Sequence, residues 1–424
     1  MFDVIKASLQ KNDITKYIII GTDIEEIQLY FIKKTLDMRR LDDTTEYVVK
    51  VYTDYEENGK KFTGVASVIL QPGMEESVID RKLAETKASA KCSKQKFFEL
   101  ANKLDDEGFV EMESNLHGTL SDMVLKLTEA VYSEDNRSDV WINSAEFFAK
   151  QATRRIITSN GTDVSFGKKT ISGEFVTQCE KPMDVETYES FSFTNFDENE
   201  IKNMVRRVLD TSVDRAKAKG SVKSGNYRVI LSGKHIPVFF NYFTEKSNGA
   251  YLYLGMSDWK KGTETQGENV TGDRINVKYL PDVPFTGDGI KLVERDFIKD
   301  GKLETVAVGQ QYAYYMGIEA TGDYNKLKVD CGTRSFEDMK KEPYLYIVNF
   351  SDVQTDTFSG VMSGEIRLGY YFDGKTVVPV SGGSMSINLL EEVGKIVLSK
   401  ESQSRDNFEG PLAIAFENVS IAGE

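Results

Sequence analysis

The strongest structural constraint in this sequence is the run at residues 344–383, YLYIVNFSDVQTDTFSGVMSGEIRLGYYFDGKTVVPVSGG. It begins with five apolar residues, passes a polar segment and resumes as an apolar stretch at residues 366–372, a composition typical of strands. Asp373-Gly374 follows at once, and Asp-Gly between two β-rich stretches is a strong hairpin signal because both residue types tolerate positive φ. The run therefore predicts a strand, a polar loop and a hairpin.

The length of the chain predicts more than one domain. Its 424 residues are too many for one ordinary hydrophobic core. Residues 220–225 have the most linker-like composition, so we place the boundary there. We expect an α+β fold with a mixed N-terminal domain of antiparallel strands and helices at residues 1–220. A β-rich C-terminal domain follows at residues 225–424, where turn signals are frequent.

Apolar periodicity predicts the individual elements. Helical spacing is found at residues 1–13, 75–104 with a break near 90–93, 119–132, 199–219 and 235–243. Strand patterns are found at residues 17–21, 47–52, 62–70, 171–179 and 227–232. Residues 25–38 fit a strand or a helix, and the sequence leaves that choice open.

Charge and composition exclude several classes of function. The net charge of −14 argues against a broad nucleic-acid-binding face, which needs a basic stripe, and we interpret the pair Arg206-Arg207 as part of a solvated helix face. No stretch approaches the roughly 18 apolar residues that cross a bilayer. Without a signal-peptide pattern, we expect a cytoplasmic protein that binds neither membrane nor nucleic acid. Cys92, Cys179 and Cys331 are few and widely spaced, which favours reduced thiols.

Several segments resemble the TldD/PmbA family, whose members are often labelled modulators of DNA gyrase. TDTFS at residues 355–359, Ser363-Gly364 and FDGKT at residues 372–376 follow the order of the family's TGDFS, SG and ENGEI segments. Ser159-Asn160-Gly161 resembles the family's SNG hairpin, and residues 411–423 resemble its closing strand. The resemblance covers nearly the whole C-terminal half and, more loosely, the N-terminal half.

The catalytic branch of that family carries HExxxH on a helix early in the C-terminal domain and, with a downstream Cys, binds a metal for peptide hydrolysis. Such a site needs two imidazoles on one helix face and a Glu near the metal-bound water. This chain has two histidines, His117 and His235. His235 stands at the corresponding place, but Ile236 replaces the Glu and Phe240 replaces the second His. With Cys331 as a lone further ligand, we expect no metal and no cofactor.

Other catalytic arrangements are not favoured either. No Ser stands in a GxSxG elbow, and the glycine-rich segments lack the spacing of phosphate-binding loops. Asp352 and Asp356 lack the spacing and the final Glu of a calcium loop. We therefore assign no catalytic residue, and whether the chain alone is an enzyme stays open.

The resemblance implies the metal-free, PmbA/TldE-like subunit of a TldD/TldE-type peptidase system that trims or degrades peptides and unfolded proteins. It also implies a homodimer, or a heterodimer with a metal-bearing TldD-like subunit. We expect Thr357, Ser359, Gly360, Ser363 and Gly364 to contact peptide, because extended chains pair with strand edges and glycine permits close approach. Two alternatives remain: an autonomous hydrolase with an unrecognised site, and a homodimeric binding or scaffold protein.

Overall fold

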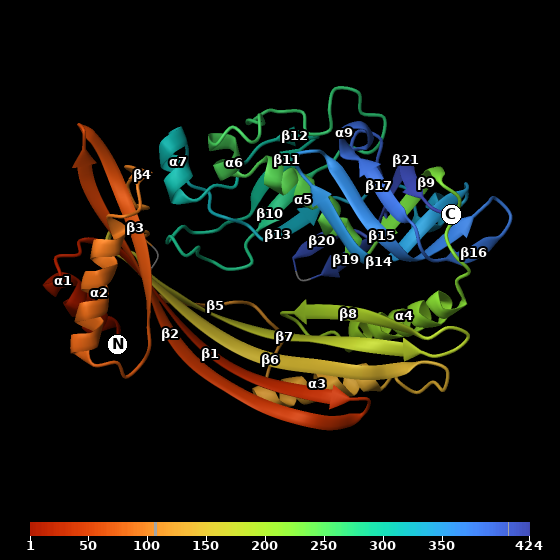
Figure 1. Ribbon diagram of the computed structural model, residues 1–424, viewed down its shortest axis with the longest axis horizontal. Coiled ribbons are helices and arrows are strands. Elements are labelled where there is room, and N and C mark those ends of the chain that lie inside the picture. The colour runs from red at the N-terminus through yellow and green to blue at the C-terminus, as the bar shows by residue number, and fades with distance from the viewer. Residues whose placement is uncertain (106–107, 406) are drawn as a thin grey trace.

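The computed structural model describes residues 1–105, 108–405 and 407–424. These residues form three sheets with helices beside and between them, and the α+β class is confirmed (Figure 1). One large, mostly antiparallel sheet belongs to the N-terminal half, and two sheets belong to the C-terminal half. No described helix combines the length and the apolar character that a bilayer span requires.

The N-terminal sheet is built from long, curved strands (Figure 1). Its strands are β1 (Lys16–Ile32), β2 (Thr35–Glu57), β3 (Lys60–Leu70), β4 (Gln95–Lys96), β5 (Gly108–Glu111), β6 (Trp141–Thr158), β7 (Asp163–Cys179) and β8 (Val185–Phe193). The order is β4-β3-β2-β1-β6-β7-β5, and β8 also pairs with β7. Residues 25–38 prove to be strand on both sides of a turn at Lys33-Lys34, and β1 pairs with β2 along its whole length. The predicted Ser-Asn-Gly turn joins β6 to β7.

Four helices belong to this half. They are α1 (Phe2–Lys11), α2 (Glu76–Ala90), α3 (Leu120–Tyr132) and α4 (Glu198–Lys217). In α4, Ile201, Val205 and Leu209 recur at helical spacing and are buried in the core that the helix shares with the sheet. The other face of α4 carries charged side chains.

The predicted helix at residues 75–104 is wrong beyond Ala90. The chain turns there, forms the short strand β4 and continues without helix. Phe98 and Leu100 are buried in a cluster with Tyr52 and Val164 from the sheet. Contacts with distant strands therefore decide the conformation that the local apolar pattern assigned to a helix.

The C-terminal half holds a seven-stranded and a six-stranded sheet. The first comprises β9 (Gly225–Ser232), β14 (Tyr344–Asp356), β15 (Val361–Phe372), β16 (Val377–Val380), β17 (Ser384–Asn388), β18 (Val397–Leu398) and β21 (Ala413–Ala422). The second comprises β10 (Val277–Leu280), β11 (Arg295–Lys299), β12 (Lys302–Leu303), β13 (Lys326–Val329), β19 (Ser402–Arg405) and β20 (Phe408–Pro411). The helices are α5 (His235–Lys246), α6 (Gly249–Tyr253), α7 (Gln310–Met316), α8 (Phe336–Met339) and α9 (Leu389–Glu392).

Helix α5 is the centre of the C-terminal core. The ring of Phe239 lies 5.4 Å from that of Phe416 on one sheet, and the ring of Phe240 lies 5.7 Å from that of Phe408 on the other. Both contacts join fully buried aromatic rings. Because it contacts both sheets, α5 is held in one orientation, which fixes the direction in which its first residues point.

The run at residues 344–383 forms two successive hairpins. β15 pairs with β14 and with β16, and Asp373-Gly374 makes the second turn, as predicted. The polar segment predicted as a loop is instead mostly strand, because β14 continues to Asp356 through irregular pairing. The predicted boundary at residues 220–225 falls between the end of α4 and the start of β9 and stays a prediction.

Candidate functional site

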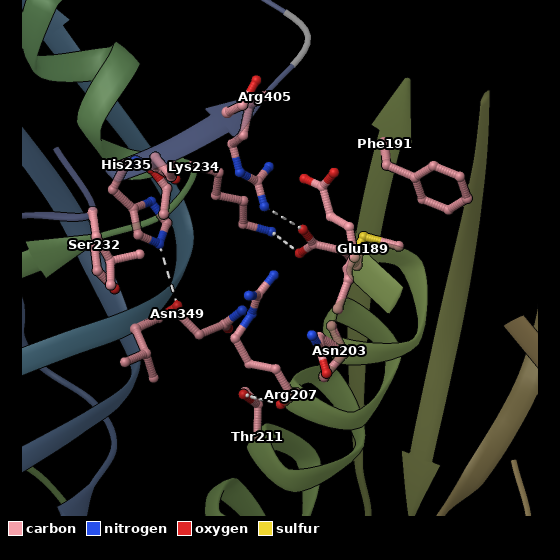
Figure 2. Close-up of a pocket in the computed structure, with 18 of the residues that line it drawn as sticks. Glu189, Phe191, Asn203, Arg207, Thr211, Ser232, Lys234, His235, Asn349 and Arg405 are labelled. Carbon is pink, nitrogen blue, oxygen red and sulfur yellow. Dashed lines mark hydrogen bonds and ion pairs between the residues drawn. The ribbon is translucent and has the colours of Figure 1, made fainter. Parts of the chain in front are cut away.

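The candidate site is a cavity of about 1400 Å³ between the two halves (Figure 2). Its N-terminal wall is formed by β8 and α4, and its C-terminal wall by the start of α5 with parts of β14 and β19. The volume exceeds the roughly 300–1,000 Å³ typical of small-molecule pockets. The space is therefore large enough for a segment of peptide chain.

Glu189 on β8 is the most buried charged group in the cavity wall and is 6% exposed. Its carboxylate accepts hydrogen bonds from Lys234 Nζ at 2.8 Å and from Arg405 Nη2 at 3.2 Å (Figure 2). Burial raises the pKa of Glu189, but the two cations outweigh it and hold this pKa below its ordinary value. Three elements distant in sequence thus meet in one ion cluster.

The two arginines on α4 differ in their partners. Arg206 also lines the cavity, but its Nε donates to Glu134 Oε2 at 2.6 Å, and Glu134 is not part of the lining. The guanidinium of Arg207 makes no hydrogen bond or ion pair with any residue in the described part of the chain, and it points towards the cavity (Figure 2). Desolvation by the surrounding protein lowers the pKa of Arg207 from its ordinary value, although the residue as a whole remains exposed to solvent. Both arginines are exposed to solvent, which agrees with the interpretation of the pair as part of a solvated helix face.

His235 begins α5 at the position where the sequence places the first His of HExxxH. It is 3% exposed, its Nε2 lies 3.3 Å from the carbonyl oxygen of Val348, and its ring meets that of Phe350 edge to face at 4.8 Å. Burial lowers the pKa of His235 to about 4. The imidazole is consequently neutral near pH 7.

The residues around His235 do not fit the family's metal. Ile236 and Phe240, at the positions of the Glu and the second His, are fully buried in the hydrophobic core. Neither side chain has an atom that coordinates a cation or takes up a proton. Cys331 is exposed and its thiol faces the carbonyl oxygen of Glu401. Within residues 1–105, 108–405 and 407–424, no three His, Cys, Asp or Glu side chains are grouped to hold a metal.

The residues predicted to contact peptide lie together around the β14–β15 turn and on β15, away from the cavity walls. Thr357 is buried and donates to a carboxylate oxygen of Glu245 on α5, while Ser359 Oγ donates to Asp356 at 2.8 Å. Gly360 has a φ of 69°, which suits glycine in a turn.

Ser363 and Gly364 lie on a strand that has neighbours along both edges. They pair with β14 on one side and with β17 on the other. A side-chain carbon at Gly364 would stand 2.7 Å from the carbonyl oxygen of Asp352 and 2.8 Å from the ring of Phe350. The space beside Gly364 is therefore filled by the protein itself, and peptide contact at these positions stays a prediction.

Sequence reasoning missed the ion cluster. Residues 185–193 read VETYESFSF, and the structure buries Val185, Thr187 and Glu189 on alternate positions of β8. An acidic residue in the apolar register of a strand is a signal that a buried cation lies nearby. The cations themselves, Lys234 and Arg405, had no local signal in the sequence.

Comparison with known proteins assigns the class to which this fold and cavity belong. Residues 224–423 match the model of the PmbA/TldA metallopeptidase C-terminal domain. The C-terminal part of the chain thus matches the C-terminal domain of the PmbA/TldD family, a metallopeptidase-related group of proteins.

Particular relatives agree with this assignment. TldE from Thermococcus kodakarensis has the same fold with a TM-score of 0.79 at 15% identity, over 99% of this chain and 100% of that one. A protein of Thermotoga maritima, named as a proposed modulator of a DNA gyrase, has a TM-score of 0.77 at 17% identity over 99% of both chains. A protein named "Metalloprotease" from Methanothermobacter thermautotrophicus is 20% identical over 311 residues. That alignment spans 68% of this chain and 65% of the relative, less than two thirds of the relative's length.

Proposed function

We propose that this protein is the metal-free, TldE-like subunit of a TldD/TldE-type peptidase system that trims or degrades peptides and unfolded proteins. The observation that carries the proposal is the burial of Ile236 and Phe240 in the C-terminal core. The helix that bears the metal ligands in the catalytic branch here uses those positions for packing. The likeness in fold to TldE over nearly the full length supports the proposal.

A chain without metal ligands can take part in peptide hydrolysis if a second subunit carries the metal. Peptide hydrolysis by a metallopeptidase needs a Lewis acid that activates water at neutral pH. A TldD-like partner would supply the metal and the water-activating Glu. This chain would supply a wall of the chamber that holds an unfolded substrate, including the cavity between its two halves.

Metal analysis and peptidase assays test the proposal. The purified chain is expected to contain no stoichiometric metal and to leave an unstructured peptide intact. Mixed with the HExxxH-bearing homologue of the same organism, it is expected to form a complex that cleaves the peptide. A control complex, in which the partner's HExxxH glutamate is replaced by glutamine, is expected to assemble without activity.

Other outcomes would establish the alternatives. Cleavage by the isolated, metal-containing chain would overturn the proposal in favour of an autonomous hydrolase. A homodimer that neither binds the HExxxH-bearing homologue nor changes its activity would favour a scaffold or binding protein. A cytoplasmic location, which the proposal includes, is checked by fractionating cells.

A further inference from the structure

We propose that the cavity between the two halves is a carboxylate-binding site, in which Arg207 forms an ion pair with a carboxylate of an extended peptide beside Lys234 and Arg405. The inference deepens the proposed function, because it names the chemical group of the substrate that this subunit recognises. All the residues of the proposed site belong to this chain.

Among the described residues that line the cavity, Arg207 is a cation without a bonded anion. Lys234 and Arg405 both bind the single carboxylate of Glu189. Arg207 comes from α4, and the three cations converge from three different elements (Figure 2). An incoming carboxylate would therefore meet one unpaired guanidinium and two cations that share one negative charge.

The other acidic groups of the cavity wall do not supply the missing partner. Asp197 Oδ1 accepts the backbone N–H groups of Asn199 and Glu200, at 2.9 and 3.1 Å, and so caps α4. Asp210 binds Arg137 at 2.7 Å. Glu200 has no bonded cation, and burial together with Asp197 raises the pKa of its carboxyl group.

A guanidinium is well suited to bind a carboxylate. Its N–H groups form a planar fork that donates two parallel hydrogen bonds to the two carboxylate oxygens. The partial desolvation that lowers the pKa of Arg207 would also strengthen such a pair relative to one in open water. Asn349, which is 9% exposed and lies on β14 in the C-terminal wall, adds an amide to the lining of the cavity.

The neighbouring strand β8 favours a ligand with an extended backbone. Residues 189–193 all line the cavity, although successive side chains of a strand point to opposite faces. The cavity consequently runs along an edge of β8. Among the described strands, only β7 pairs with β8, so that edge has backbone groups to offer an extended peptide.

Peptide binding to the purified chain tests the inference without any partner or turnover. The probe is an N-terminally labelled, unstructured hexapeptide of neutral residues, measured by fluorescence anisotropy. Three forms are compared: one with a free C-terminal carboxylate, one with a C-terminal amide, and an amide form with one internal Glu. If the terminal carboxylate is recognised, only the first binds well, with about tenfold higher affinity than the amide. If an acidic side chain is recognised, the third regains that affinity.

Matched variants assign the recognition to Arg207. Arg207→Gln is expected to bind the acid and amide forms equally, with about tenfold weaker affinity for the preferred form. Arg206→Gln removes the same charge one residue away, from a guanidinium held by Glu134, and is expected to behave like the wild type. Arg207→Lys keeps the charge without the fork and is expected to retain part of the preference.

Three results would overturn the inference. They are equal affinity of the wild type for all three peptides, equal loss in Arg206→Gln and Arg207→Gln, and no binding of any peptide by the purified chain. Each leaves the proposed function standing, because that proposal is tested by metal content and by activity of the complex. Conversely, peptidase activity of the isolated chain would overturn the proposed function without touching the carboxylate preference.

Discussion

Two helices face the same cavity and use their sequences in opposite ways. Helix α5 turns Ile236 and Phe240 into the core, where the catalytic branch of the family has polar ligands. Helix α4 packs its apolar face on the N-terminal sheet and turns Arg207 towards the cavity. A motif position therefore does not by itself define a site; the face on which the side chain lies decides between packing and chemistry.

The largest effect is expected from truncating the packed face of α5. Phe240→Ala removes a fully buried ring that contacts Phe408, and we expect it to lower the free energy of unfolding by about 3–5 kcal/mol. Asn241→Ala, on the exposed side of the same helix, is the control and is expected to change it by less than about 0.5 kcal/mol. Urea denaturation measures both. A loss for Phe240→Ala no larger than for the control would show that this face of α5 is not a packed core.

The buried imidazole at the start of α5 predicts a pH dependence of stability. The pKa of His235 is about 4 in the folded protein, and an unfolded histidine has a pKa of about 6.5. As pH falls through this interval, His235 binds a proton in the unfolded chain but stays neutral in the folded chain. The folded state therefore becomes less stable relative to the unfolded state. The free energy of unfolding decreases by roughly 3 kcal/mol by pH 4. About 2 kcal/mol of this decrease occurs between pH 7 and 5.

Two histidine variants check this assignment. Unfolding free energies of His235→Gln measured at pH 7, 6 and 5 are expected to fall less steeply than those of the wild type. His117→Gln removes the exposed histidine and is expected to keep the wild-type slope. Identical slopes for His235→Gln and the wild type would mean that His235 is accessible to protons in the folded state.

An intermediate loss of stability is expected from disrupting the ion cluster of Glu189, Lys234 and Arg405. Glu189→Gln removes the charge that Lys234 and Arg405 share, and we expect a loss of about 1–3 kcal/mol in the free energy of unfolding. Glu186→Gln, on the exposed face of the same strand, is the control and is expected to change it by less than about 0.5 kcal/mol. Equal stabilities of the two variants in urea would show that the cluster does not join the two halves of the molecule.

The sequence predicted the elements whose signals are local. The turn at Asp373-Gly374 and the helix α4 depend on turn chemistry and on a 3.6-residue period, and both are found in the structure. The helix predicted through Phe98 failed, because that ring is buried by strands from elsewhere in the chain. Local patterns specify an element well only where distant contacts agree with them.

The candidate site was less predictable than the fold for the same reason. The loss of HExxxH is visible at Ile236 and Phe240 without any structure. The ion cluster, however, joins Glu189 to Lys234 and Arg405, which are 45 and 216 residues away along the chain. No spacing rule connects positions so distant, and only the packing of the two halves brings them together.

The smallest change in the free energy of unfolding is expected from replacing Arg207. This substitution also tests whether α4 serves ligand binding while α5 serves packing. Because its guanidinium bonds to no group in the described part of the chain, Arg207→Gln is expected to change the free energy of unfolding by less than about 0.5 kcal/mol. Urea denaturation beside the Glu189→Gln variant measures the difference. A destabilisation as large as that of Glu189→Gln would mean that Arg207 helps to hold the ion cluster together. A neutral result, combined with a lost preference for carboxylate, would separate ligand binding on α4 from structural packing on α5.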